Sequence, residues 1–242
     1  MQKEIDINKV ARQHLEMEEF FCGFTVKGVA TPTTPDQKES TMTKAEKQKE
    51  LDKIFEEVRV CCQCELVSTR NKVVPGEGNP NARIMFVGEA PGADEDAQGR
   101  PFVGRAGKLL ENIIIACGLK RSDVFIGNIL KCRPPGNRDP KAEEIICCLP
   151  FLQRQIEIIS PEVIVALGAH AAKTLLNSND TIGHLRGHFH EYVTGPGKPP
   201  IKFMATYHPA YLLRNYSQEN RKRVWEDMKK VLIELNLPVP KK

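Results

Sequence analysis

The chain has 242 residues, of which 40% are hydrophobic and 27% are charged. This is an ordinary globular composition, sufficient for one α/β domain with an appendage. The net charge of +4 does not by itself indicate a nucleic-acid partner. The charge is uneven, however: residues 198–242 hold ten Lys and Arg against four acids, so this segment could contact phosphates.

The N-terminal twenty residues are charged throughout and lack the apolar core of a signal peptide. No run approaches the roughly 18 apolar residues of a membrane span. We therefore expect a soluble intracellular protein. Its eight cysteines are then not expected to form disulfides, because reducing compartments keep thiols free. Metal binding, catalysis and core packing remain open for them.

Residues 1–20 could form a helix, whereas residues 28–44 are rich in Thr, Pro and Lys and have almost no apolar content. We expect residues 1–44 to be a flexible N-terminal extension and residues 45–242 to form the folded domain. From Lys44 onward, apolar residues recur at helical spacing, and this predicted helix runs directly into Cys61.

The rest of the chain alternates strand and helix patterns. Strands are predicted at residues 83–88, 124–132, 163–168, 188–193 and 201–208. Helices are predicted at residues 107–119, 141–159, 169–176 and 217–235. This order predicts a three-layer α/β/α fold with a central, mostly parallel four-stranded sheet. Ligands of such sheets bind beyond the carboxyl ends of the strands, which singles out the loops after Gly88, Asn128 and Tyr207.

The cysteine spacing suggests a metal site. Cys61 and Cys64 form a C-x-x-C step, Cys132 follows a predicted strand, and the pair Cys147-Cys148 lies on the next predicted helix. Four thiolates can hold either zinc or an iron-sulfur cluster, and spacing alone does not separate the two.

The remaining cysteines have simpler interpretations. Cys22 and Cys117 are expected to be small hydrophobic residues or spare thiols. Cys62 and Cys147 each lie beside a better ligand candidate, and we interpret them as bystanders.

Five signatures then occur in sequence order. They are CCQC at 61–64, VGEAPGADEDAQGRPFVGRAGKLL at 87–110, NILKCRPPGNRDP at 128–140, EEIICCLPFL at 143–152 and HPAYLLRN at 208–215. In order and spacing they resemble the family 4 uracil-DNA glycosylases, from Val60 to about Trp225. The resemblance implies a structural [4Fe-4S] cluster held by Cys61, Cys64, Cys132 and Cys148.

A glycosylase extrudes its target nucleotide, reads the base edge and stacks on the base. The resemblance assigns stacking to Phe102, whose setting between Gly99 and Gly104 favours exposure, although a core phenylalanine is the alternative. Asn128 ends a predicted strand, and its amide can accept from uracil N3–H while donating to O4. Cytosine presents the opposite pattern. The alternative is an asparagine that caps a turn.

His208 matches the family histidine that faces uracil O2, where a hydrogen-bond donor would stabilise the departing base. The histidine could act in its neutral or its charged form. A structural or surface histidine is the alternative. Glu89, Ala90 and Pro91 match the loop that lines the pocket and the attacking water. Water could be positioned by Glu89, by backbone carbonyls or by Asn137.

After His208, the residues Tyr211, Leu212 and Leu213 could form an apolar wedge that fills the gap left by the flipped base. Arg214 could contact a phosphate. The alternative is a helix start with buried leucines.

Two other groups of polar residues are read as surface features. The acids Glu95 and Asp96 are expected on a solvated loop face. Three histidines lack a carboxylate or cysteine partner and are expected on the surface near DNA rather than in a metal site; they are His184, His188 and His190.

The sequence thus predicts a monofunctional uracil-DNA glycosylase that hydrolyses the N-glycosidic bond of a flipped uracil and leaves an abasic site. The expected partner is uracil-containing DNA, single- or double-stranded, bound by a monomer in the cytoplasm at the nucleoid. A repair or replication protein could dock on the N-terminal extension. The alternatives are a DNA-binding protein without catalysis and an enzyme for another deaminated base.

Overall fold

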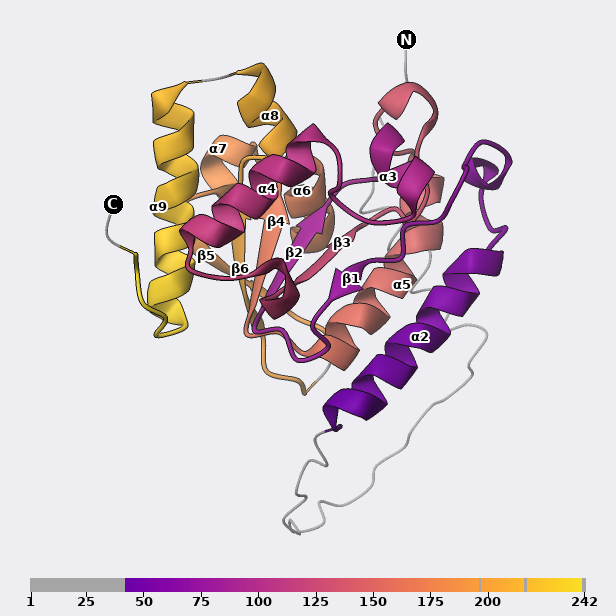
Figure 1. Cartoon of the computed structure of the whole chain (residues 1–242), viewed down its shortest axis with the longest axis horizontal. Coiled ribbons are helices and arrows are strands. Elements are labelled where there is room, and N and C mark those ends of the chain that lie inside the picture. Colours follow the sequence, from indigo (N-terminus) through magenta and orange to yellow (C-terminus); the bar gives the residue numbers. More distant parts are fainter. Residues whose placement is uncertain (1–41, 196, 216, 241–242) are drawn as a thin grey trace, which may run out of the picture. The chain divides into compact units, whose positions relative to one another are not determined.

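Six strands form one sheet in the order β1-β3-β2-β4-β6-β5 (Figure 1). The computed structural model describes residues 42–195, 197–215 and 217–240, and Thr43–Lys242 form one unit. The predicted extension lies outside the described residues up to position 41. None of the described helices is long and apolar enough to cross a membrane.

The sheet has six strands, two more than the predicted four, and its four central strands are parallel, as the prediction of a mostly parallel sheet requires. They are β3 (Phe125–Asn128), β2 (Ile84–Gly88), β4 (Val163–Leu167) and β6 (Ile201–Thr206). Two short antiparallel strands extend the sheet at its edges, β1 (Glu77–Gly78) beside β3 and β5 (Phe189–Tyr192) beside β6. The mostly parallel sheet was predicted, whereas the two-residue strand β1 is too short to give a sequence pattern.

Burial on both faces explains the continuous apolar runs of the central strands. In β2, Met85 and Val87 face one core, while Ile84 and Phe86 face the other. The first core is covered by α2 (Lys44–Val60), α5 (Ala142–Ile159), α6 (Ala169–Leu176) and α7 (Ile182–Leu185). The second is covered by α4 (Arg105–Ala116), α8 (Pro209–Arg214) and α9 (Gln218–Glu234). The result is the predicted three-layer arrangement.

Helix α2 begins with a capping box, in which Thr43 Oγ1 accepts from the Glu46 backbone amide and the Glu46 carboxylate accepts from the Thr43 amide. It packs on α5 through Ile54, Val58 and Phe151. The helix ends at Val60, so Cys61 follows it directly, as predicted. The next segment, with the short 3₁₀ helix η1 (Glu65–Ser68), carries Cys64.

One strand is shorter than predicted. The segment 124–132 pairs as a strand only to Asn128, where β3 ends. Beyond it, the Ile129 and Leu130 amides donate to the Gly88 and Glu89 carbonyl oxygens, both at 3.0 Å. These bonds keep the loops after β2 and β3 side by side before the second loop reaches Cys132 and the short helix η3 (Pro135–Asn137).

The loop after β2 contains a short helix, α3 (Ala93–Gln98), and the expectation that its acids face solvent is wrong. Asp96 is 1% exposed and accepts hydrogen bonds from the Asn71 backbone amide, at 2.9 Å, and side chain, at 2.6 Å. Glu95 accepts from the Val103 and Gly104 amides, both at 2.9 Å. The two carboxylates therefore fold the loop that holds Phe102.

Candidate functional site

The loops after β2 and β3 meet at the carboxyl edge of the sheet, with Gly88 and Asn128 as paired neighbours. A Cβ on Gly88 would lie 2.4 Å from Asn128 Oδ1 and 2.7 Å from Phe102 Cζ. Only glycine allows these two side chains to approach the strand end from both sides. The structure thus brings together the predicted stacking and base-reading residues.

Asn128 is 1% exposed, and its Oδ1 is a buried polar atom without a hydrogen-bond partner among the described residues. Such an atom costs about 1–3 kcal/mol, and its presence in a folded protein calls for a specific explanation. The turn-capping alternative is not supported, because a capping oxygen would accept a backbone amide. Asn128 is a hydrogen-bond acceptor held ready at the end of β3.

Phe102 is 6% exposed, so the expected exposure is wrong. Its backbone lies in the left-handed region, with φ of 51°, which is uncommon outside glycine and recurs at functional sites. Its ring lies 5.7 Å, centroid to centroid, from that of His208. Gly107 is required beneath it, because a Cβ there would lie 2.0 Å from the Phe102 carbonyl oxygen.

His208 precedes α8 as its N-cap, and its Nδ1 accepts the Ala210 amide at 3.0 Å. Burial, together with a smaller contribution from the nearby charge of Arg214, lowers the pKa of His208 to about 4. The ring is therefore neutral at pH 7. With Nδ1 acting as an acceptor, the proton lies on Nε2, which makes Nε2 a hydrogen-bond donor.

Glu89 lies in a cluster that the sequence did not suggest. Ligand atoms of Glu89, Asp139 and His170 lie within 4.8 Å of one another, and His170 Nε2 is 3.6 Å from Asp139 Oδ1. Burial raises the pKa of Glu89; His170 and Arg214 act to lower it, and Asp139 acts to raise it. His170 was not predicted because α6, which follows β4, reaches this edge only through the parallel topology.

The other residues of the first motif lie near Glu89 in the chain, with Ala90 half-buried and Pro91 buried. Asn137, the alternative for positioning water, is exposed, and its Oδ1 accepts from Arg133 Nε at 2.8 Å. Its φ of 53° fits a turn residue. Asn137 is thus occupied within its own turn, whereas Glu89 is half-buried at the strand edge.

The residues predicted to form an apolar wedge differ in their exposure. Leu212 is 4% exposed and packs in the second core, so insertion into DNA would require unfolding α8. Leu213 is 37% exposed, and Arg214 is also exposed. Tyr211 is half-buried, with its ring 5.1 Å from that of Tyr207. Leu213 and Arg214 remain candidates for DNA contacts.

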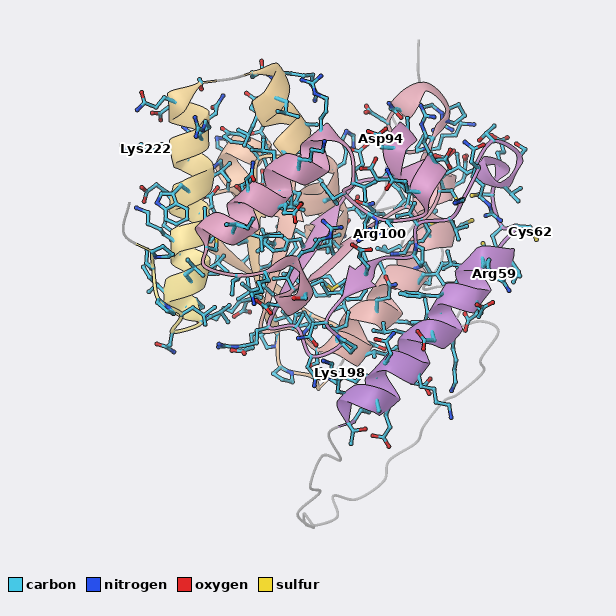
Figure 2. The ribbon with its side chains drawn as sticks, viewed as in Figure 1. Arg59, Cys62, Asp94, Arg100, Lys198 and Lys222 are labelled. Atoms are coloured by element: carbon cyan, nitrogen blue, oxygen red, sulfur yellow. The ribbon has the colours of Figure 1, made fainter. Side chains whose placement is uncertain are left out.

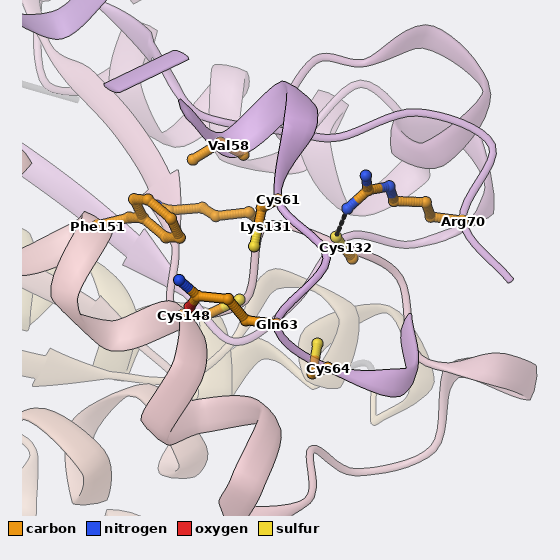
Figure 3. Close-up of a pocket in the computed structure, with 9 residues that line it drawn as sticks. All are labelled: Val58, Cys61, Gln63, Cys64, Arg70, Lys131, Cys132, Cys148 and Phe151. Atoms are coloured by element: carbon orange, nitrogen blue, oxygen red, sulfur yellow. Dashed lines mark hydrogen bonds between the residues drawn. The ribbon is translucent and has the colours of Figure 1, made fainter. Parts of the chain in front are cut away.

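Four cysteines from three separate segments line one cavity, together with Lys131, Arg70 and Phe151 (Figure 3). They are Cys61, Cys64, Cys132 and Cys148. Arg70 Nη1 donates to Cys132 Sγ at 3.4 Å. Burial raises the pKa of Cys148 to about 12 and raises that of Cys132, so a bound metal would have to displace the protons.

The spacing of these sulfurs does not decide the kind of metal. Within the described part of the chain, only Glu89, Asp139 and His170 bring three potential ligand atoms within 4.8 Å of one another. No three cysteine sulfurs are that close. Four cysteine thiolates around one cavity suit either zinc or an iron-sulfur cluster.

The neighbouring cysteines do not line this cavity. Cys62 is exposed and points away from the domain (Figure 2), and Cys147 Sγ donates to the Gln63 carbonyl oxygen at 3.3 Å. Cys117 is buried in the second core. Cys22 lies outside the described residues.

The structure also places the histidines that the sequence suggested for the surface, His184, His188 and His190. His188 just before β5 and His190 within it have ring centroids 4.4 Å apart, and His190 Nε2 lies 2.8 Å from the Leu185 carbonyl oxygen. His184 is exposed. They are not among the residues that gather three metal-ligand atoms.

Comparison with known proteins places this arrangement in a family. The family model described as Uracil DNA glycosylase superfamily matches residues 75–229. The type-4 uracil-DNA glycosylase of Saccharolobus solfataricus is 49% identical over 186 residues, covering 75% of this chain and 84% of the relative. That of Thermotoga maritima is 48% identical over 178 residues, covering 73% and 90%. A type-5 enzyme of Pyrobaculum aerophilum is 35% identical over 156 residues, covering 57% and 66%. The chain therefore belongs to the type-4 group of the uracil-DNA glycosylase superfamily.

Proposed function

We propose that the protein is a monofunctional uracil-DNA glycosylase, which hydrolyses the N-glycosidic bond of a uracil flipped out of DNA and leaves an abasic site. The observation that carries this proposal is the buried, unpartnered Oδ1 of Asn128 beside Phe102 and His208. Family membership supports it independently.

Base reading follows from the two ends of one amide. The Asn128 Oδ1 accepts uracil N3–H, and its Nδ2 donates to O4. Cytosine has an acceptor at N3 and a donor at N4. The Asn128 Oδ1 would then face another acceptor, and its Nδ2 would face another donor. A buried site built for hydrogen bonding rejects such mismatches strongly, because its polar groups then stay unpaired. Phe102 offers its ring face for stacking on the base.

Bond cleavage needs stabilisation of the departing base. The electron pair of the C1′–N1 bond leaves with uracil, and part of its charge reaches O2. The neutral His208 ring donates a hydrogen bond from Nε2–H to O2 and stabilises the negative charge there. The ring keeps its proton throughout. Because Nδ1 already accepts the Ala210 amide, the donor is fixed before the substrate arrives.

Water must add to C1′ from the opposite side, with loss of a proton. We assign its orientation to the Glu89 carboxylate, which accepts one water hydrogen and passes the proton on to solvent. Half-burial beside His170 and Asp139 supports Glu89 over Asn137, whose Oδ1 is already bonded to Arg133.

DNA contacts are assigned to α8 and its end. Leu213 would occupy the space left by the flipped base, and Arg214 would contact a phosphate. We further propose that the protein acts as a monomer on single- or double-stranded DNA in the cytoplasm, at the nucleoid. Residues 1–44 would then be available to a repair or replication partner.

The cysteine cavity is proposed to hold a [4Fe-4S] cluster, with Cys61, Cys64, Cys132 and Cys148 as ligands. Four cysteines from three segments line the cavity, and four thiolates are the ligand set of such a cluster; the resemblance to the family 4 enzymes favours it over one zinc ion. When bound, the cluster would cross-link the end of α2, the loop after β3 and α5. Its contribution is structural, because the recognition and cleavage groups all lie on other residues.

A second candidate function is excision of another deaminated base. It is favoured only by the first motif, in which Glu89 is followed by Ala90, and this is where a change of substrate would lie. The remaining alternative, a DNA-binding protein without catalysis, does not explain why Asn128 keeps a buried, unpartnered acceptor.

Substitution of the base-reading and leaving-group residues tests the proposal directly. Asn128→Asp should slow uracil release on the order of 10⁴-fold, because the donor to O4 is lost. His208→Ala should slow it about 10²- to 10³-fold, because the donor to O2 is lost. The measurement is single-turnover release from uracil-containing oligonucleotides, followed by alkaline cleavage of abasic sites. Asn112→Asp, an exposed site on α4, is the control. Full activity in both test variants contradicts the assignment.

The cofactor assignment can be tested by comparing each proposed ligand cysteine with the cysteine near it in the chain. Cys148→Ser and Cys64→Ser should lose iron and the broad visible absorption of a cluster, because each removes a thiolate ligand. Cys147→Ser and Cys62→Ser should keep both and contain about four iron atoms per chain. Iron, sulfide and zinc are measured on purified protein. Stoichiometric zinc without iron, or iron loss in the control pair instead, contradicts the assignment.

The pH dependence of excision tests the role of Glu89. Its pKa is raised by burial, so single-turnover rates should fall with decreasing pH at values above the usual range for a carboxyl group. Asp139→Asn removes a negative neighbour and should move this acid limb to lower pH. His170→Asn removes a positive neighbour and should move it to higher pH. Glu111→Gln, exposed on α4, is the control. If the acid limb of the pH–rate profile is unchanged in both variants, Glu89 does not orient the water.

A further inference from the structure

Lys131 places a buried side-chain amino group between the base-reading residue and the cysteine cavity. It is 1% exposed, and its Nζ donates to the Asn128 carbonyl oxygen at 2.9 Å and to Gln155 Oε1 at 2.8 Å. Gln155, on α5, is fully buried and donates in turn to the Pro75 carbonyl oxygen at 2.8 Å. These bonds join the end of β3 to α5.

The same residue borders the cysteines. Lys131 lines their cavity (Figure 3), and its backbone amide hydrogen-bonds to the Cys148 sulfur. Its carbonyl oxygen accepts the Val74 amide at 2.8 Å. Lys131 therefore contacts the cavity through its backbone and the last residue of β3 through its side chain.

Packing alone does not explain a lysine at this position. Burying an ammonium group costs several kcal/mol unless charge and hydrogen bonds compensate, and an apolar side chain of similar volume would avoid this cost. The Asn128 carbonyl and the Gln155 side chain, to which Nζ donates, are both uncharged acceptors. A methionine would fill the space but would leave the Asn128 carbonyl oxygen without this donor.

We propose that Lys131 is a positioning residue that fixes the Asn128 peptide and, through it, the orientation of the amide that reads uracil. The bond to the Asn128 carbonyl and the bond to Cys148 make this strand end a direct link between base recognition and the cysteine cavity. The proposal rests on the proposed function, because it assumes that Asn128 reads the base.

The test separates base reading from folding by using two DNA ligands. One oligonucleotide carries 2′-fluoro-2′-deoxyuridine, which resists cleavage and presents the uracil edge. The other carries a tetrahydrofuran abasic analogue, which presents no base. The variants are Lys131→Met and, as a milder change to the same chain of bonds, Gln155→Leu. Arg154→Gln is the control, because Arg154 is adjacent on α5 and pairs with the surface residue Glu57.

Lys131→Met should bind the uracil analogue about tenfold more weakly, which corresponds to the loss of one buried hydrogen bond. Binding of the abasic analogue and iron content should stay unchanged, and Gln155→Leu should show a smaller loss in the same direction. Arg154→Gln should match the unmodified protein. Iron content, visible absorption and unfolding temperature are measured alongside.

Two outcomes overturn the proposal. If both variants bind the uracil analogue normally, Asn128 does not depend on Lys131. If affinity for both DNAs falls together with iron content, Lys131 serves the fold rather than base reading. Failure of the proposed function is distinguishable, because the unmodified protein would then bind the uracil analogue no better than an otherwise identical oligonucleotide that carries thymidine at the same position.

Discussion

Asn128, at the end of a central parallel strand, keeps a buried side-chain oxygen that has no hydrogen-bond partner among the described residues, and the site is organised around this one atom. A folded protein bears the cost of an unsatisfied acceptor where a ligand supplies the missing donor. This requirement also explains two features of the residues around the Asn128 amide. Gly88 leaves space beside the amide, and Phe102 adopts a left-handed backbone to bring its ring to the same place.

The parallel topology explains how distant segments reach this edge. Strands β2, β3, β4 and β6 all end there, which brings Glu89, Asn128, His170 and His208 to one side of the sheet. The cysteine cavity lies beside the same loop, because Cys132 is only four residues beyond Asn128. A group that cross-links the cysteines would therefore also stiffen the loop that carries the base-reading amide.

The parts of this arrangement that could be predicted from the sequence have strong local signals. Apolar runs identified the central strands, and the ligand set from the family motifs agrees with the four cysteines that share one cavity. Burial was harder to predict, because it depends on tertiary contacts. Phe102 and Asp96 were expected at the surface, yet Glu95 and Asp96 fold their loop inward and bury both residues.

Other features had no local signal. His170 and Asp139 approach Glu89 only through the order of strands, and Lys131 is one of many lysines in the sequence. Leu212 and Leu213 are equivalent in sequence, and only the packing of α8 separates a core residue from an exposed one. Long-range contacts, rather than composition or periodicity, decide each of these cases.

The central claim is that the Asn128 oxygen accepts the N3–H of uracil. The most direct measurement compares single-turnover excision of uracil and of N3-methyluracil from otherwise identical oligonucleotides. Methylation removes the donor and leaves the leaving-group oxygen O2 in place. The account predicts that N3-methyluracil is retained in the DNA while uracil is released. Release of both bases at similar rates would contradict it.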